Sequence, residues 1–551
     1  MNIQLAAWGA KDRDEYIRKL AETAFDVLII GGGITGAGIL RECGLQGMKA
    51  ALIEKEDFAF GTSSKSTRLA HGGLRYILNL EFGLVWEETH ERDWMREAFP
   101  NMARPVPIII STYSYLEAFI TRFVLMLYDA LSGWGNYRIP RYLSRQEVEE
   151  LEPKLTISGL HSGLLYYECI INDARLTAEI VKEGVMRGGM ALNYLKALRI
   201  LKDHGRAVGV EVLDKETGKI IPMRAKNVVT ATGPWTDELF PEGYSPSGRL
   251  IKPSKGVHII VRREKIGNQG GLYVKSPVDR RGVFVLAHGD FTYIGTTDTH
   301  YGGDLDHCYT EDKEYEYFKG IIEHCFPAAQ FEPEDLLGTY AGVRPLVQQD
   351  GVSEHKTSRR EFIAEVYPGF FVITGGKLTI FRSMAEKLLT FMAAHGADST
   401  PNPQKSLSRS PFKLGITKQD WDHLLHRHGL AGINLDEKTH NHLYENYGRG
   451  SLEILNRVKA DINLAEKITK DQQYIWAELE YALEYEMIVH IKDFLMRRTN
   501  LSLHQRNNHR ELGLKVAERM AQHLGWDRAR IEKEVEDYVD LAQKNRFFLK
   551  A

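Results

Sequence analysis

The first 54 residues alternate between apolar and polar stretches in a way that predicts a strand–helix–strand unit. Residues 25–30 (FDVLII) form an apolar run typical of a buried strand, and residues 49–54 (KAALIE) form a second. Residues 34–46 between them have the spacing of a helix. Residues 1–24 are mixed and charged and predict a short helix in an N-terminal extension ahead of this unit.

Further apolar runs predict a chain of mixed α/β class, α+β overall. Helical segments lie between some of these runs, and the mixture indicates a parallel-sheet domain interleaved with a mixed or antiparallel one. The runs that predict strands are 208–213, 227–231, 257–262, 282–287 and 370–374.

The pattern changes near residue 400. Residues 396–411 are rich in Ser, Pro and polar side chains and predict a linker. Beyond them β-branched runs almost disappear, and stretches such as 477–498 have helical periodicity with charged faces. Residues 412–551 are therefore expected to form an all-α C-terminal domain.

Length and composition exclude several classes of protein. The 551 residues exceed the ~250–300 residues of a single hydrophobic core, and 43% hydrophobic with 26% charged residues excludes collagen-like and disordered chains. A net charge of −3 provides no global field for nucleic acid, so no nucleic-acid partner is expected.

The cysteines and the apolar runs indicate where in the cell the protein is expected to lie. The four cysteines, Cys43, Cys169, Cys308 and Cys325, are scattered without the short spacing of a metal site, which predicts no metal and a reduced cytosolic interior. The N-terminus lacks the order of a signal peptide, and no run approaches a membrane span. The protein is expected to be soluble or at most peripheral.

A glycine-rich turn follows the first predicted strand. Residues 31–36 (GGGITG) fit G-x-G-x-x-G, in which Gly31 permits a tight turn, Gly33 lets a pyrophosphate approach and Gly36 lets helix and strand pack closely. The helix N-terminus offers N–H groups to phosphate. Glu54 ends the second strand, where a carboxylate binds ribose hydroxyls. The alternative is a glycine-rich turn without a ligand.

The next segment favours FAD over NAD. Residues 61–77 (GTSSKSTRLAHGGLRYI) are polar and carry glycines where a nicotinamide fold would normally continue with another crossover unit. Thr62, Ser63 and Ser64 could donate to a second phosphate or to a flavin, and Gly72 and Gly73 let the backbone approach a flat ring.

Several motifs together resemble a known family. Besides residues 25–39 and 61–77, they are NVVTATGPWTD at 227–237, IGTTDTHY at 294–301, GTYAGVRPL at 338–346, FVITGGKLTIFRSMAEK at 371–387 and a C-terminal stretch at 477–501. The chain resembles the FAD-dependent glycerol-3-phosphate dehydrogenases, within the wider group of D-amino-acid oxidase and glycine oxidase. HGGLRY, AGVRPL and GGKLT in this order are the most specific motifs.

The resemblance implies an activity and its partners. It implies oxidation of sn-glycerol 3-phosphate to dihydroxyacetone phosphate in glycerol catabolism, by hydride transfer to N5 of non-covalently bound FAD, with a quinone as electron acceptor. An oxidase that uses oxygen and an amine or amino-acid oxidase of the same fold are the alternatives. A homodimer and a cytoplasmic protein in peripheral contact with the membrane are compatible with the family.

The resemblance also implies a division into domains. A Rossmann-like FAD-binding domain comprises residues 25–80, 165–250 and 340–395, and a substrate-binding domain comprises residues 81–164 and 251–339. The cofactor residues that the matched motifs imply are Gly31, Gly33, Ile34, Thr35, Gly36, Glu54, Lys55, Thr62, Ser63, Ser64, His71, Gly72, Gly73, Ala231, Thr232, Gly233, Gly376, Lys377, Leu378 and Thr379.

Five residues are candidates for catalysis and substrate binding. His71 is either the base that takes the hydroxyl proton or a group that positions the flavin. Arg75 shares a face with His71 if the segment is helical. Arg344 in AGVRPL could grip the substrate phosphate, or pair with a carboxylate that supports its turn. Arg359 is a second phosphate candidate, and Lys377 could stabilise negative charge on reduced flavin or bind substrate.

Two further features have two interpretations each. Residues 115–131 (YLEAFITRFVLMLYDAL) predict a very apolar helix with Glu117, Thr121, Arg122 and Asp129 within less than half of its circumference. Such a helix lies either in a membrane surface or in the core against the substrate domain. Asp298 in GTTDT is more typical of a turn than of catalysis.

Overall fold

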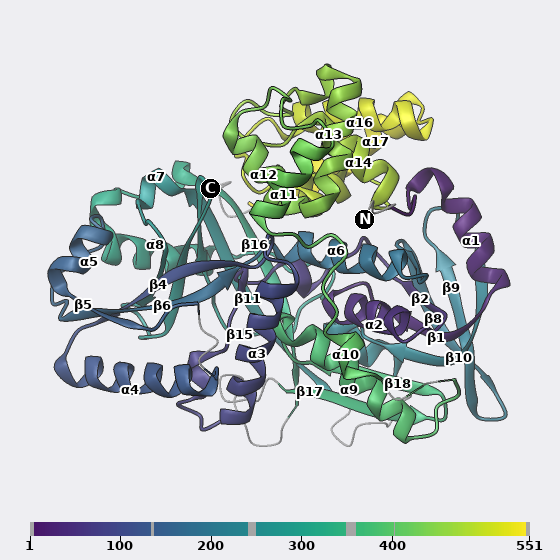
Figure 1. The fold of residues 1–551 in the computed structure, drawn as a ribbon, viewed down its shortest axis with the longest axis horizontal. Coiled ribbons are helices and arrows are strands. Elements are labelled where there is room, and N and C mark those ends of the chain that lie inside the picture. The colour runs from purple at the N-terminus through teal and green to yellow at the C-terminus, as the bar shows by residue number, and fades with distance from the viewer. Residues whose placement is uncertain are drawn as a thin grey trace.

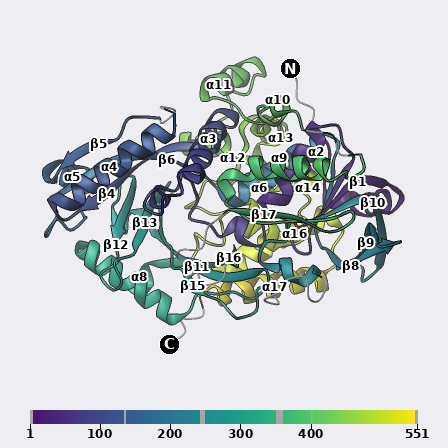
Figure 2. The ribbon, with the colours of Figure 1, turned by 90° about the horizontal axis from the view of Figure 1, so that it is seen from below.

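The computed structural model describes residues 5–133, 137–240, 249–348, 360–399, 401 and 403–546. Two β-sheets lie side by side, and a helical C-terminal domain covers one edge of both (Figure 1). β4, β5 and β6 of the second sheet lie at the end of the molecule away from β8, β9 and β10 of the first (Figures 1 and 2). The predicted mixed α/β class is confirmed.

The first sheet has a parallel centre in the order β18-β10-β1-β2-β7. β17 pairs antiparallel with β18, and β8 and β9 extend the sheet as a hairpin beside β10. Its strands are β1 (Ala24–Ile30), β2 (Ala50–Ile53), β7 (Met190–Leu192), β8 (Leu195–Asp203), β9 (Arg206–Asp214), β10 (Ile220–Thr230), β17 (Glu361–Tyr367) and β18 (Phe370–Gly375).

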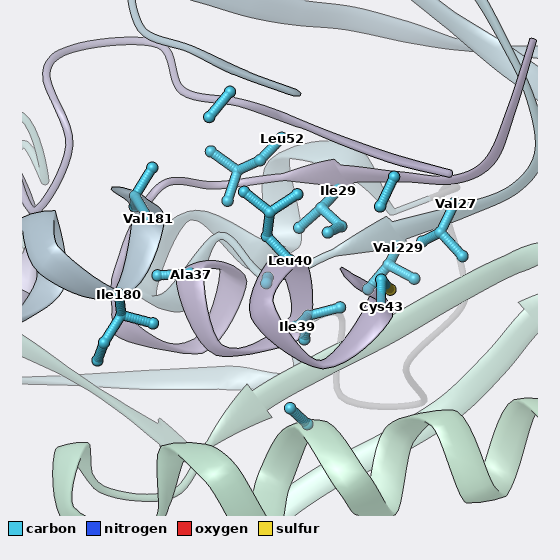
Figure 3. Close-up of a cluster of buried hydrophobic side chains, with 14 of the residues drawn as sticks. Val27, Ile29, Ala37, Ile39, Leu40, Cys43, Leu52, Ile180, Val181 and Val229 are labelled. Atoms are coloured by element: carbon cyan, nitrogen blue, oxygen red, sulfur yellow. The ribbon is translucent and has the colours of Figure 1, made fainter. Parts of the chain in front are cut away.

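Continuous apolar runs form the central strands because both faces of these strands are buried, with a layer of helices packed on the sheet. The covering helices are α2 (Ile34–Leu45), α6 (Asp173–Met186) and α9 (Phe381–Ala394). Figure 3 shows Ile39 and Leu40 of α2 packed among Ile29 of β1, Leu52 of β2 and Val181 of α6. The predicted strand–helix–strand unit at 25–54 is confirmed.

The register of the first sheet brings its carboxyl ends to one edge. Ile30 pairs with Ile53 of β2 and with Thr230 of β10. The residues that follow these strands, Gly31, Glu54 and Ala231, therefore meet at the same edge, which is where open α/β sheets bind ligands.

The second sheet has ten strands and is antiparallel except where β12 runs parallel to β4. Its strands are β3 (Leu69–Ala70), β4 (Arg104–Thr112), β5 (Arg141–Ser144), β6 (Ser162–Ile170), β11 (Ile251–Arg262), β12 (Gly271–Lys275), β13 (Gly282–His288), β14 (Phe291–Gly295), β15 (Thr299–His300) and β16 (Leu336–Val347). Its helices are α3 (Phe82–Ala98), α4 (Tyr115–Leu131), α5 (Arg145–Leu151), α7 (Arg263–Ile266) and α8 (Asp312–Cys325).

The residues at which the two predicted domains begin and end remain a proposal. β3 and most of β16 lie in segments predicted for the FAD-binding domain, yet both pair within the second sheet. The predicted linker carries a short helix, α10 (Lys405–Ser408), and is tied to α2 because the Arg41 guanidinium donates to the carbonyls of Ser408 and Ser410.

The C-terminal domain is helical throughout its described residues. The predicted helical stretch 477–498 is broken, because α14 ends at Tyr485 and Met487 adopts a positive φ of 47°. A π-helical turn, Phe494–Arg498, follows α15. The helices are α11 (Lys418–Arg427), α12 (Glu437–Tyr447), α13 (Ser451–Ala460), α14 (Trp476–Tyr485), α15 (Ile491–Asp493), α16 (His509–Leu524) and α17 (Arg528–Lys544).

The N-terminal extension contains the predicted short helix, α1 (Arg13–Glu22), and is anchored by Trp8. The buried indole donates from Nε1 to the carbonyl of Ala191 at 2.9 Å. The backbone of Trp8 donates to the carbonyl of Glu484 at 2.8 Å and accepts from the N–H of Met487 at 3.0 Å. The extension therefore connects the first sheet to the C-terminal domain.

Candidate active site

A cavity of about 1120 Å³ opens at the carboxyl edge of the first sheet and continues along the second sheet. Its volume slightly exceeds the ~300–1,000 Å³ of an ordinary small-molecule site, as a dinucleotide together with a substrate would require. The predicted site residues that line it are Gly31, Gly33, Ile34, Thr35, Glu54, Lys55, Thr62, Ser63, His71, Gly73, Ala231, Thr232, Gly233, Arg344, Gly376, Lys377, Leu378 and Thr379.

Three predicted cofactor residues do not line this cavity. A Cβ at Gly36 would collide with the carbonyl oxygen of Gly31, so this glycine serves the packing of helix on strand. The hydroxyl of Ser64 faces the carbonyl of Gly61, and the N–H of Gly72 donates to the hydroxyl of Tyr128. The side chain of Arg75 and the whole of Arg359 lie outside the described part of the structure.

The glycine turn has the geometry that a pyrophosphate needs. Gly31 has φ +113°, and a Cβ there would lie 2.6 Å from the carbonyl oxygen of Ala231. The N-terminus of α2 faces the cavity through Gly33 and Ile34. Since N–H groups and the helix dipole attract anions at this end, the residues present fit a dinucleotide phosphate.

Glu54 is held next to this turn with its carboxylate oriented. Its Oε2 accepts a hydrogen bond from the N–H of Gly32 at 2.7 Å, and Oε1 accepts from Glu56 at 2.8 Å. Burial raises the pKa of Glu54. Each carboxylate oxygen can accept more than one hydrogen bond, so Glu54 can also receive ribose hydroxyls.

Aromatic residues that sequence reasoning missed lie at the same end of the cavity. The Lys55 ammonium lies 4.4 Å above the ring of Trp235 and pairs with Asp306 at 2.7 Å. Trp235 and Phe60 both line the cavity. The motif ATGPW contains this tryptophan, but its distance from Lys55 along the chain hides the contact.

His71 follows β3 in an extended segment and faces the cavity. The N–H of Gly73 donates to its Nδ1 at 3.1 Å, and Gly73 itself has a φ of +69°. The next helical turn begins only at Leu74. The condition under which His71 and Arg75 would share a helical face is therefore not met, because these two residues do not belong to one helix.

Lys377 is buried in the cavity wall. It follows two glycines with positive φ, Gly375 and Gly376, after β18. Its ammonium pairs with the buried carboxylate of Glu88 at 2.6 Å and lies 4.2 Å above the ring of Tyr76. Only 8% of the Lys377 side chain is exposed, so its ammonium faces the cavity and not bulk solvent.

Arg344 pairs with a carboxylate and also faces the cavity. Its Nη2 donates to the Thr296 hydroxyl at 2.8 Å and to the Thr297 carbonyl at 3.1 Å, and its Nη1 lies 3.3 Å from Asp298. The guanidinium also lines the cavity opposite Gly256, where a Cβ would collide with it. The carboxylate pair thus orients a cation that faces the cavity.

His258 is a second cavity histidine that sequence reasoning missed. Its ring stacks on Tyr340 at a centroid distance of 4.8 Å, and its Nε2 lies 3.0 Å from the Thr67 hydroxyl. Burial, followed by the charges of Arg344 and Arg68, lowers the pKa of His258 well below its usual range. The ring is therefore neutral at physiological pH.

One wall of the cavity reaches an exposed apolar surface. Leu78, Leu116 and Ile120 line the cavity and are also 46–68% exposed. They belong to the apolar face, which we define as Leu78, Leu80, Trp86, Tyr115, Leu116, Phe119, Ile120, Phe123 and Met126.

The apolar face explains why helix α4 had two interpretations. One side of α4 buries Val124, Leu125 and Tyr128 against the second sheet, while the other side exposes Phe119 and Phe123. Figure 1 shows α4 along the lower edge, opposite the C-terminal helices. Within the described ranges, no helix combines the length and apolarity needed to cross a bilayer.

Two family models match most of the chain. Residues 26–384 match the FAD dependent oxidoreductase family, and residues 392–531 match the C-terminal domain of alpha-glycerophosphate oxidase. The aerobic glycerol-3-phosphate dehydrogenase of Staphylococcus epidermidis is 33% identical over 88% of each chain. That of Staphylococcus aureus is 32% identical over 96% of this chain and 97% of its own.

Solved structures agree with this assignment. The glycerol-3-phosphate dehydrogenase from Bacillus halodurans, complexed with FAD, matches with a TM-score of 0.79 and 28% identity over 98% of both chains. Glycine oxidase from Geobacillus kaustophilus shares the fold alone, with a TM-score of 0.53 and 19% identity over 71% of this chain and 99% of its own. The chain belongs to the family of FAD-dependent oxidoreductases that carry the C-terminal domain of alpha-glycerophosphate oxidase.

Proposed function

We propose that the protein oxidises sn-glycerol 3-phosphate to dihydroxyacetone phosphate and passes the electrons to a membrane quinone. The observation that carries this proposal is the oriented Arg344 guanidinium, which lines the same cavity as the dinucleotide turn. The names of the staphylococcal relatives and of the Bacillus halodurans structure support the substrate.

The chain's own residues hold the two reactants. Bound FAD supplies the two-electron acceptor. The turn at Gly31 and the N-terminus of α2 hold its pyrophosphate, and Glu54 holds a ribose. Arg344 binds the substrate phosphate through its charge and its remaining N–H groups, and three hydrogen bonds fix the plane of its guanidinium in advance.

His71 completes the site as a hydrogen-bond donor, and Lys377 completes it as a cation. Because Nδ1 of His71 accepts the Gly73 N–H, the neutral ring carries its proton on Nε2. A donor at the substrate hydroxyl stabilises the negative charge that this oxygen gains as its proton passes to solvent water. The Lys377 ammonium stabilises negative charge on the reduced cofactor or the substrate.

We infer that the electron acceptor is a lipid-soluble quinone that arrives through the apolar face. A contiguous exposed apolar surface is typical of a membrane or partner contact. Leu78, Leu116 and Ile120 belong both to this surface and to the cavity, so an apolar acceptor could reach the site without crossing water. A homodimer and a cytoplasmic location remain predictions from the resemblance.

Anaerobic flavin bleaching tests this proposal. The purified protein is mixed with sn-glycerol 3-phosphate, glycerol, glycine or D-alanine, and then with a quinone in lipid vesicles or with air. We expect fast bleaching by glycerol 3-phosphate, much slower bleaching by unphosphorylated glycerol, no bleaching by the amino acids, and faster reoxidation by quinone than by air. Bleaching by an amino acid would contradict the substrate, and faster reoxidation by air would indicate an oxidase.

A further inference from the structure

A buried carboxylate connects the C-terminal domain to the first sheet. Asp57 is 0% exposed and receives hydrogen bonds from two consecutive arginines, Arg497 and Arg498. The guanidinium of Arg498 binds it in bidentate fashion, with distances of 2.8 Å from Nη1 to Oδ2 and 2.9 Å from Nη2 to Oδ1. Asn193 adds a hydrogen bond at 3.0 Å.

The two arginines belong to the π-helical turn Phe494–Arg498, and other bonds fix them there. Arg497 also donates to Asp493 at 2.8 Å, and Arg498 also donates to the carbonyl of Glu486 at 2.8 Å. π-Helical turns are rare in proteins overall, but those that occur often lie at functional sites. The guanidinium groups are therefore held from within the C-terminal domain.

Asp57 lies in the loop that carries Glu54. This loop, residues 54–60, follows β2 and is tied to the glycine turn in both directions: Gly32 donates to Glu54 at 2.7 Å, and Ala59 donates to the carbonyl of Gly32 at 3.0 Å. Ala59 has a φ of +65°, a conformation that a non-glycine residue keeps only when its surroundings hold it. The hydrogen bonds from Arg497 and Arg498 to Asp57, which we call the clamp, supply such a constraint.

Asp57 remains charged in this buried position. Burial acts to raise its pKa, but the charges and hydrogen bonds of Arg498 and Arg497 outweigh burial and hold the pKa of Asp57 below its usual range. A buried carboxylate that loses one partner is strongly destabilised, so the loop would move to relieve it.

We propose that the C-terminal domain retains FAD through this clamp. Arg497 and Arg498 are positioning residues that fix Asp57, and through it the loop that presents Glu54 to the ribose. They act through the loop and not on the cofactor itself. The inference rests on FAD as the cofactor of the family and is independent of the proposed substrate.

The test measures FAD release from the holoenzyme after dilution, by the rise in flavin fluorescence, and the Tm of the same samples, all without substrate. Arg498→Lys keeps the charge and loses the bidentate fork. The control is Arg104→Lys, because Arg104 also joins the second sheet to the C-terminal domain, and its ion pair is with Glu445 and not with Asp57, Glu486 or residues 54–60.

We expect Arg498→Lys to accelerate FAD release by about tenfold or more and Arg104→Lys to leave it within about twofold. Equal acceleration by both variants would mean a general loosening of the domain interface and would overturn the proposal. Unchanged release from Arg498→Lys would also overturn it.

A double-mutant cycle tests the route through Glu54 with nearly isosteric changes. Asp57→Asn and Glu54→Gln should each accelerate FAD release. Because both act on the same ribose contact, the double variant should release FAD no faster than about twice the rate of Glu54→Gln alone. Effects that multiply would show that Asp57 acts elsewhere, and the proposal would fail.

Discussion

The backbone N–H of Gly73 donates to Nδ1 of His71 across 3.1 Å. An imidazole nitrogen that accepts a hydrogen bond carries no proton, so the neutral ring has its N–H at Nε2. For His71 to take the substrate proton at Nδ1, this bond to Gly73 would have to break first. The geometry favours a hydrogen-bond donor over a general base.

Two substitutions of His71 separate a donor from a base. His71→Ala should slow anaerobic flavin reduction by ~10²–10³-fold, the usual loss for one donor to a developing oxyanion. His71→Gln places an amide N–H in the same region and should recover the rate to within about tenfold of the wild type. Stopped-flow absorbance of the flavin measures both. A glutamine variant as slow as the alanine variant would restore the role of base.

Arg344→Ala should raise the apparent substrate constant by about 30- to 1000-fold. The reason is that the phosphate loses charge-assisted contacts to a cation, which costs roughly 2–4 kcal/mol. Steady-state kinetics measure the constant, and unphosphorylated glycerol is the control because it cannot use this contact. Equal losses for both substrates would mean that Arg344 supports the flavin or the fold. Asp298→Asn should give a smaller loss in the same direction.

Lys377 should contribute separately to stability and to chemistry. Lys377→Met leaves the buried Glu88 carboxylate without its ammonium, which should cost about 3–5 kcal/mol of folding free energy. The double variant Lys377→Met with Glu88→Gln should regain most of the Tm but not the rate of flavin reduction. Recovery of both quantities would assign Lys377 a structural role alone.

The apolar face should control vesicle binding without affecting the first half-reaction. Phe119→Ser and Phe123→Ser each remove an aromatic group worth about 1.5–3 kcal/mol when buried, so each should lower vesicle partitioning by about tenfold or more. Quinone reduction in vesicles should fall in parallel, while flavin reduction by substrate stays unchanged.

Ile220→Ser and Ile462→Ser are matched controls, because both isoleucines are exposed but lie outside the apolar face. Sedimentation with anionic vesicles measures the partitioning. If the controls weaken partitioning as much as the phenylalanine variants do, the binding is not specific to this face.

Stability should fall as the pH rises above neutrality because of His490. Burial acts to lower its pKa, but hydrogen bonds to Glu216 and Glu534 outweigh burial and raise the pKa of His490 to about 9. Since the pKa of an unfolded histidine is near 6.5, this stabilisation is fully present below about pH 6.5 and is lost as the pH rises through 9.

The change is at most about 3.5 kcal/mol, because the pKa rises from 6.5 to about 9 and one pKa unit corresponds to about 1.4 kcal/mol. Thermal unfolding between pH 6 and 9.5 measures it. The Tm of the wild type should decline more steeply with pH over this range than the Tm of His490→Gln. Parallel curves would show that His490 is not the titrating group.

Sequence patterns predicted the part of the site whose residues lie close together along the chain. The apolar run at 25–30, the glycines that follow it and Glu54 all lie within one strand–helix–strand unit, so their spacing determines their geometry. The positions of Arg344 and Lys377 in the cavity were predicted only through motifs that resemble a family, because they come from distant strands.

Features that depend on contacts between residues far apart along the chain could not be predicted from the sequence. His258 enters the cavity through the register of β11 against β16, where it pairs with Tyr340. The stretch 477–498 has helical periodicity, yet Glu486 pairs with Arg175 from α6, and the helix ends just before it. Both sides of α4 are apolar, so periodicity could not decide which side the second sheet covers.

The hydrogen bonds of Trp8 can form only in a certain order while the chain is being synthesised. The backbone partners of Trp8, Glu484 and Met487, are synthesised about 475 residues after it, whereas the partner of its indole, Ala191, is synthesised much earlier. At a synthesis rate of ~5–20 residues per second, the backbone of Trp8 waits roughly half a minute to a minute and a half for its partners. A nascent chain stalled before α14 could therefore bind the indole to the first sheet but would leave the backbone of Trp8 without these two hydrogen bonds.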